Sequence, residues 1–141
     1  MVKAALIILH YKGEDDTKAC LDSLRDSKMQ NIDLSLIVVA NNPSASLVSD
    51  MHTVYPEFTL IENKENVGFA EGNNIGIRKA LELQCEYIVL LNNDTLVSPD
   101  IISKLVTHAN SQDLVGLISP KIYFAKGYEY HRERYKEDER G

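Results

Sequence analysis

The chain predicts an α/β domain with a doubly wound, mostly parallel β-sheet. Three observations indicate this class. Strand and helix signals alternate along the chain, as in a series of βαβ units. The strand segments are continuous apolar runs, which is typical of strands covered on both faces. Polar segments follow the strand ends, where open α/β sheets bind their ligands.

Apolar runs identify the strands. The first three expected strands are Ala4–Tyr11, Leu34–Ala40 and the shorter Phe58–Glu62. The fourth, Tyr87–Leu91, is the most informative, because five apolar or aromatic residues in a row end abruptly in the polar segment Asn92–Thr95. We expect this strand at the centre of the sheet. Two short strands are expected after it, at Val115–Ser119 and Lys121–Phe124, with Pro120 between them.

Capping residues and apolar stripes identify the first two helices. The helix Glu14–Ser27 begins with acidic residues, which favour the positive end of the helix dipole. Its expected apolar stripe is Cys20, Leu21 and Leu24. Ser44 or Ser46 is expected to cap a second helix that runs to about Val54.

Two more helices are expected further along the chain. The third runs from about Phe69 to Leu83, and its expected apolar face consists of Ala70, Asn74, Ile77 and Leu81. The fourth opens at Ser98-Pro99-Asp100, which supplies a cap, a first-turn proline and an acid. Its expected buried stripe is Ile101, Ile102, Leu105, Val106 and Ala109.

Composition bounds the class of protein. The chain has 141 residues, 44% hydrophobic and 26% charged, which suits one soluble globular domain with a core. The net charge of -6 argues against broad nucleic-acid binding, which requires a basic face. Cys20 and Cys85 lie far apart in apolar settings, so we expect two buried free thiols and a reducing cytoplasm. No segment is long enough to span a bilayer, and the apolar start is interpreted as a strand.

The end of the chain differs from the rest. Residues 126–141 are dense in charged side chains and contain almost no aliphatic residue, so they can add little to a core. We therefore divide the chain into an α/β domain, residues 1–124, and a charged tail, residues 125–141. The tail is interpreted as the start of a missing C-terminal half.

Four polar loops are expected at one edge of the sheet, because the carboxyl ends of parallel strands meet there. They are His10–Gly13, Ala40–Asn42, Asn63–Gly68 and Asn92–Thr95. Together they predict a cleft lined with hydrogen-bonding groups. The Asp94 carboxylate offers the hard oxygens that Mg²⁺ or Mn²⁺ prefers, and such an ion would hold a diphosphate.

The segment Asn66–Asn74 has poor helix formers at an expected helix start. Gly68 permits a tight approach, and Gly72 lets a ligand or another backbone come close. The amides of Asn73 and Asn74 are suited to ribose, phosphate or neighbouring carbonyl groups. The alternative is that one of them, Asn74 in particular, only ties the helix to an adjacent loop.

These segments resemble the family 2 inverting glycosyltransferases of the GT-A fold, near the rhamnosyltransferase-like members. The run Asn-x-Gly-Phe-Ala-x-Gly-Asn-Asn at residues 66–74 is the most specific match. The other matching segments come in the family's order and are Leu6–Tyr11, Cys20–Leu24, Ile37–Ser44, Leu90–Thr95 and Gly116–Tyr123. The resemblance covers the chain up to about residue 124. It implies the N-terminal, nucleotide-sugar-binding half of a GT-A enzyme, truncated before its acceptor half.

The resemblance implies a role for each matching position. Tyr11 and its neighbour His10 would contact the nucleotide base, and Asn41 would lie near the base or ribose. The ribose and diphosphate pocket would be formed by Asn66, Gly68, Gly72 and Asn73, with Asn93 also on the nucleotide sugar. Asn92, Asn93 and Asp94 match the family's DxD-type motif. Its last acid, Asp94, would bind Mg²⁺ or Mn²⁺, with Asn92 as a neighbour.

The implied activity is metal-assisted transfer of a sugar from a UDP- or dTDP-sugar to a saccharide or polysaccharide acceptor. The implied location is the cytoplasm, with peripheral association of the full-length protein at the inner face of the membrane. Ala40 stands where the family usually has an aspartate that recognises the base. The family's catalytic base lies in the C-terminal half, so it stays unassigned here and this chain would only bind donor. An exposed face left by a missing half would allow a homodimer.

Three alternatives belong to other classes. The first is a non-catalytic nucleotide-binding or interaction module. The second is a receiver-like phosphoacceptor domain, for which Asp15, Asp16 and Lys121 offer the residue types, but the third strand ends in Glu62-Asn63 without an aspartate to phosphorylate. The third is a nucleotidyltransferase, which should have a glycine-rich loop after the first strand, where only Gly13 occurs.

Overall fold

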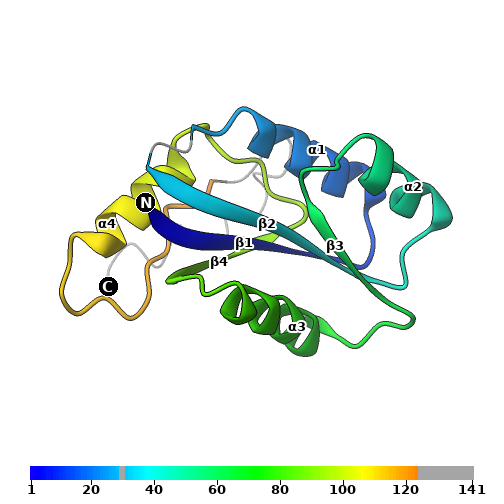
Figure 1. The fold of residues 1–141 in the computed structure, drawn as a ribbon. Coiled ribbons are helices and arrows are strands. Elements are labelled where there is room, and N and C mark those ends of the chain that lie inside the picture. Colours follow the sequence, from blue (N-terminus) through cyan, green and yellow to red (C-terminus); the bar gives the residue numbers. More distant parts are fainter. Residues whose placement is uncertain (29–30, 124–141) are drawn as a thin grey trace, which may run out of the picture.

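Strands and helices alternate along the chain as predicted (Figure 1). The structure is a computed structural model, and it describes residues 1–28 and 31–123. Its strands are β1 (Val2–His10), β2 (Ile32–Asn41), β3 (Thr59–Asn63) and β4 (Tyr87–Asn92). Its helices are α1 (Glu14–Arg25), α2 (Ala45–Thr53), α3 (Phe69–Glu82) and α4 (Ile101–Asn110). None of these helices has the combined length and apolar character that crossing a bilayer requires.

The four strands form one sheet in the order β3-β2-β1-β4, and every neighbouring pair is parallel. The register places His10 beside Ala40, Asn41 beside Asn63, and Leu9 beside Asn92. All four strands therefore end at the same edge of the sheet, which we call the carboxyl edge. The predicted parallel α/β fold is confirmed, and the loops that follow the strands share this edge.

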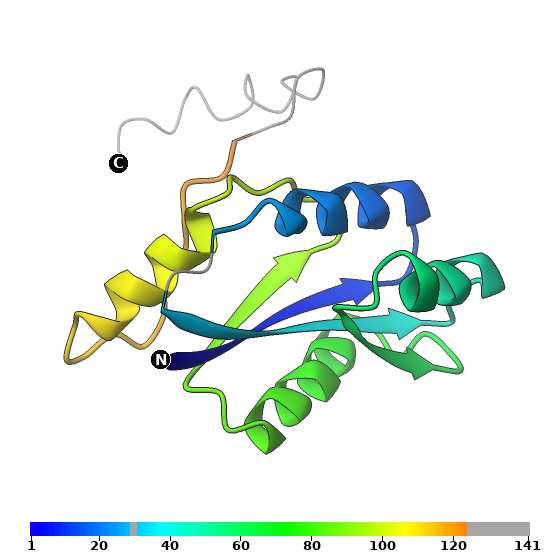
Figure 2. The ribbon, with the colours of Figure 1, turned by 45° about the horizontal axis from the view of Figure 1, so that its top comes forward.

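The helices cover both faces of the sheet, so the prediction of a doubly wound domain is also confirmed. Helices α1, α2 and α4 pack on one face, and α3 packs alone on the other (Figures 1 and 2). Alternate residues of β1 enter the two cores: Leu6 and Ile8 face α1, whereas Ala5 and Ile7 face α3. Since both sets are fully buried, β1 is the covered central strand.

The apolar face predicted for α3 is wrong except at Ile77, which packs against the core. The residues that turn inward are small, namely Gly72, Asn73, Gly76 and Ala80. On the predicted face, Ala70 and Asn74 are exposed and Leu81 is 60% exposed. The glycines let the helix approach the sheet closely, since a Cβ at Gly76 would lie 2.5 Å from Ile7 Cγ2. Small residues at the contact between α3 and the sheet carry no hydropathy signal. The spacing of apolar residues therefore pointed mostly to the exposed side of the helix.

The prediction that Tyr87–Leu91 is central and covered on both faces is also wrong. Strand β4 lies at the end of the described sheet and pairs only with β1 there. Its residues are half-buried at best, and Leu90 is 50% exposed. An apolar run records a strand's preference for burial, but the strand's place in the sheet depends on which other segments pair with it.

The two short strands expected after α4 do not form in the described residues. Val115–Ser119 and residues 121–123 have no strand structure, and Leu117 is 92% exposed. Within the described residues no strand lies beside them, and an unpaired strand gains neither ladder hydrogen bonds nor cross-strand packing. Phe124 and the charged tail, residues 125–141, lie outside the described residues, so the division at residue 124 stays a prediction.

Two smaller expectations also change. Helix α4 begins at Ile101 with Asp100 at the N-cap position, but no side chain caps it. The Asp100 carboxylate accepts instead from Ser98 Oγ at 3.2 Å and pairs with Lys104. Cys20 is buried and free as predicted, whereas Cys85 is free but only half-buried.

Candidate functional site

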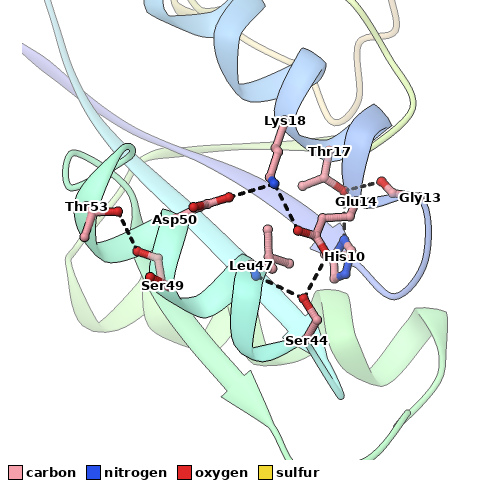
Figure 3. Close-up of polar contacts among 10 residues, drawn as sticks. All are labelled: His10, Gly13, Glu14, Thr17, Lys18, Ser44, Leu47, Ser49, Asp50 and Thr53. Carbon is pink, nitrogen blue, oxygen red and sulfur yellow. Dashed lines mark hydrogen bonds and ion pairs between the residues drawn. The ribbon is translucent and has the colours of Figure 1, made fainter.

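A buried cluster joins the ends of β1 and β4 at the carboxyl edge. His10 Nδ1 lies 2.8 Å from Thr17 Oγ1, and the Thr17 hydroxyl also lies 3.0 Å from the Gly13 carbonyl (Figure 3). Asn93 Nδ2 donates to Thr17 Oγ1 at 2.8 Å and to the Lys12 carbonyl at 2.8 Å. The loop that carries Asn93 is therefore hydrogen-bonded to the loop that follows β1.

His10 is neutral in this cluster at ordinary pH. Its side chain is 4% exposed, and burial lowers its pKa because a charged imidazolium would lose its hydration. The Glu14 carboxylate opposes this shift, but the net direction of the pKa is downward. A neutral imidazole has one donor nitrogen and one acceptor nitrogen. His10 therefore offers the surrounding loops one group of each kind.

A chain of asparagine amides joins the ends of β2 and β3 to the start of α3. Asn63 Nδ2 donates to Asn41 Oδ1 at 2.8 Å, and Asn41 Nδ2 donates to Asn66 Oδ1 at 3.0 Å. The backbone N–H of Gly68 donates to the same Asn66 oxygen at 3.0 Å. Asn41 is 1% exposed, so its amide organises these loops from within. Gly68 begins the turn into α3 with φ 85°, a backbone conformation that residues with a side chain rarely adopt.

The first turns of α3 lie against the sheet at the carboxyl edge. Gly72 packs on the Leu9 side chain, which a Cβ would overlap. Asn73 is buried, and its Nδ2 donates to the Phe69 carbonyl of the same helix at 2.9 Å. Asn74 lies on the exposed side of the helix. Two of the residues predicted to form a pocket thus also serve the packing of the helix that carries them.

Asn92, the last residue of β4, and Asp94, in the turn that follows, are both exposed. The Cys20 thiol of α1 lies close by, with Sγ 3.8 Å from the Asn92 carbonyl. Burial raises the pKa of Cys20 to about 11, and the negative charge of Asp94 adds to the rise. The Asp94 carboxylate therefore lies on the α1 side of the carboxyl edge, open to solvent.

Sequence reasoning missed an ion-pair network beside these loops. Lys18 Nζ lies 3.0 Å from Glu14 Oε1 and 2.7 Å from Asp50 Oδ2 (Figure 3). Ser44 Oγ donates to Glu14 Oε2 at 2.8 Å and accepts from the Leu47 N–H at 3.0 Å, which caps α2. Hydrogen bonds from Lys18 and then Ser44 lower the pKa of Glu14. The i,i+4 spacing of Glu14 and Lys18 could have predicted their ion pair from the sequence, whereas nothing in the sequence indicated the contact with Asp50.

Two hollows of the described surface lie away from these groups. They measure about 340 and 270 Å³ and flank α4, near the N-terminus and so at the opposite end of the sheet (Figure 1). Their lining includes Ser103 and Thr107, which belong to both. At the carboxyl edge, Tyr11 and Asp94 are exposed to solvent. Among the residues predicted to bind a ligand, Tyr11, Asn66 and Asp94 are therefore accessible to solvent. His10, Asn41 and Asn73 are buried.

Comparison with known proteins identifies the family. Residues 5–140 match the family described as Glycosyl transferase family 2. The chain is 30% identical over 124 residues to the low-salt glycan biosynthesis hexosyltransferase Agl10 of Haloferax volcanii. That match covers 87% of this chain and 38% of the hexosyltransferase, so the chain spans less than two fifths of this relative's length.

Two solved structures share the fold. S. aureus TarS 1–349 in complex with UDP-GlcNAc aligns with a TM-score of 0.67 at 13% identity, over 85% of this chain and 37% of that one. The mannosyltransferase PcManGT from Pyrobaculum calidifontis, in complex with GDP-Man and Mn²⁺, aligns with a TM-score of 0.58 at 22% identity. This second alignment covers 73% of this chain and 31% of that one. At these identities the similarity concerns the fold alone, and it confirms the predicted GT-A architecture.

The matched region contains every segment that suggested the resemblance, from Leu6 to Tyr123. A match of this extent decides against the receiver-domain alternative. The predicted family is confirmed by the family match and by the hexosyltransferase relative. The chain belongs to glycosyl transferase family 2.

Proposed function

We propose that this chain is the donor-binding part of a glycosyltransferase. The enzyme transfers a sugar from a nucleoside-diphosphate donor to a saccharide acceptor, with the help of a divalent cation. One observation carries the proposal: Asp94 is exposed just beyond the tip of a parallel strand, on the edge where β1, β2 and β3 also end. Ligands of open α/β sheets bind at this edge. Membership of the family supports a nucleotide sugar as that ligand.

Donor recognition would use groups that the fold leaves accessible. The Tyr11 ring is exposed, and the positive charge of Lys12 lies over its face, with Nζ 5.2 Å from the ring centroid. The Oδ1 atom of the Asn66 side chain accepts two hydrogen bonds, whereas its Nδ2 has no partner among the described residues. The two N–H groups of this amide can therefore donate to a ribose or phosphate oxygen. Asn93 can offer its Oδ1, since both its amide protons are bonded internally.

The donor is proposed to be a UDP- or dTDP-sugar. The TarS structure contains UDP-GlcNAc and the mannosyltransferase structure contains GDP-Man, so guanine is the alternative base. Ala40 is fully buried and aligned with His10 in the register, and it offers no polar group to a base. Base selection would therefore rest on Tyr11, His10 and the loop after Asn41.

The residues present fit a divalent cation. In the part of the chain that the structure describes, no three His, Cys, Asp or Glu side chains gather closely enough to hold a metal by themselves. Magnesium sites built from one or two carboxylates and the phosphates of a ligand need no such cluster. Asp94, with the Asn92 amide as neighbour, would supply the protein's share for Mg²⁺ or Mn²⁺. When bound, the ion would stabilise the charge that develops on the departing nucleoside diphosphate.

The protein's own residues would position the donor rather than move a proton. The Asn41 amide holds the loop before α3, and the Lys18–Asp50 ion pair joins α1 to α2. No described residue is assigned as the base that deprotonates the acceptor. We propose that this base belongs to the part of its relatives' length that the chain does not span.

Calorimetry with UDP, dTDP and GDP, each with and without Mn²⁺, tests the proposal. We expect binding that requires the metal and that is lost in Asp94→Asn, which keeps the shape of the side chain but not its charge. Asp113→Asn is the matched control, because it removes an exposed acid from the loop after α4. Binding that is equal without metal, and equal in Asp94→Asn, would instead support the passive nucleotide-binding module.

A further inference from the structure

The Thr17 hydroxyl is the point where the segments after β1 and β4 meet the first turn of α1. Three polar groups surround its oxygen: His10 Nδ1 at 2.8 Å, Asn93 Nδ2 at 2.8 Å and the Gly13 carbonyl at 3.0 Å. The Thr17 side chain is fully buried, so water cannot replace any of these partners. A buried polar cluster of this kind holds its members in one arrangement as long as every group is satisfied.

The partners determine which group donates each proton. A hydroxyl donates one hydrogen bond and accepts up to two. The Gly13 carbonyl can only accept, so the Thr17 proton points to it. The orientation of the Asn93 side-chain amide follows from its contact with the Lys12 carbonyl. This carbonyl can only accept, so the atom facing it must be the amide nitrogen of Asn93. Both remaining partners of Thr17 must then donate, and His10 can do so only from Nδ1.

We propose that Thr17 is a positioning residue for the metal-binding loop, and that it holds neutral His10 in the Nδ1–H form with Nε2 as an acceptor. The first part rests on the proposed function, because it concerns Asp94, the neighbour of Asn93. Both amide protons of Asn93 anchor this loop to the β1 side, one of them on the Thr17 oxygen. The second part rests on the hydrogen bonds together with the burial of His10, which disfavours the charged imidazolium. His10 is the last residue of β1, and in this form its Nε2 can only accept a hydrogen bond.

The test compares the wild type with Thr17→Val and Thr17→Ser. Valine keeps the shape and removes the hydroxyl, whereas serine keeps the hydroxyl. We expect Thr17→Val to weaken Mn²⁺-dependent binding of the nucleoside diphosphate by roughly 10-fold, the lower end of the range for losing a group that orients a metal ligand, because Thr17 acts on Asp94 through its neighbour Asn93. Thr17→Ser should stay within about threefold of the wild type, since its oxygen keeps the same partners. Equal binding by the wild type and Thr17→Val would overturn the positioning role.

Nitrogen-15 NMR of the histidine side chains gives a second readout that needs neither ligand nor metal. We expect His10 as the Nδ1–H tautomer in the wild type and in Thr17→Ser, assigned by loss of its signals in His10→Gln. An Nε2–H tautomer in the wild type would overturn the hydrogen-bond assignment. This measurement uses the unmodified protein, so it decides the question even if Thr17→Val does not fold. If no nucleotide binds the wild type, the proposed function fails while the tautomer still tests Thr17.

Discussion

Gly76→Ala tests how α3 is held against the sheet. A Cβ at this position would lie 2.5 Å from Ile7 Cγ2 and 3.2 Å from Val39 Cγ2. Both neighbours are β-branched residues of buried strands, so they have little freedom to move aside. Overpacking of this kind costs about 1–3 kcal/mol. Alanine in place of glycine inside a helix gains about 1 kcal/mol. The expected net change is therefore a loss of roughly 1 kcal/mol, with the sign set by the contact with the sheet.

Thermal unfolding of the whole chain measures this change. A loss of about 1 kcal/mol corresponds to a fall in Tm of roughly 4 °C for a domain of this size. Asn74→Ala, on the exposed side of the same helix, is the control and should raise stability by about 0.5 kcal/mol through helix propensity alone. Gly72→Ala should be milder than Gly76→Ala, because its neighbour is the flexible end of Leu9. If Gly76→Ala raises the Tm as the control does, the close approach of α3 is wrong.

Three further predictions concern the cap of α2, the buried His10 and the two cysteines. Ser44→Ala removes the α2 cap and should cost about 1 kcal/mol of unfolding free energy, whereas Ser49→Ala in the exposed part of the same helix should change little; chemical denaturation compares them. The pKa of His10 is lowered in the folded state, so as the pH falls His10 is protonated in the unfolded chain before it is protonated in the folded one. Stability is then fully present above the unfolded value of 6.5 and falls as the pH drops toward the folded pKa; His10→Gln should remove this slope in unfolding curves across that window. Cys20, buried with a pKa of about 11, should resist alkylation until unfolding, whereas half-buried Cys85 should react first; rapid labelling of Cys20 in the folded protein would contradict its burial.

The elements themselves were predictable because their signals are local. The stripe Cys20, Leu21 and Leu24 is buried as expected, and Ser44 caps α2 as one of the two candidates. Strand ends were placed within a residue or two, since each apolar run is bounded by polar residues. The gathering of the polar loops at one edge followed from the strand directions, and the all-parallel sheet bears it out.

The roles of single polar side chains at the carboxyl edge were harder to predict from the sequence. Asn41 was expected near the base or ribose, and its amide is engaged with Asn63 and Asn66. Asn93 was expected on the donor, and both its amide protons are bonded to the β1 side. Nothing in the sequence indicated the role of Thr17, because a threonine in the first turns of a helix is common. An amide or hydroxyl can bond equally well to a ligand or to the protein, and residue type does not distinguish the two.

The sequence by itself determined the βαβ order, the edge where the polar loops meet and the accessible acid at residue 94, because these follow from local periodicity and strand direction. Only the tertiary structure decided that β4 flanks β1 at the end of the described sheet, that α3 packs through Gly72 and Gly76, and that Thr17 joins two loops. Those three facts depend on contacts between segments far apart in the chain. The residues that make such contacts, small or polar, leave no periodic trace in the sequence.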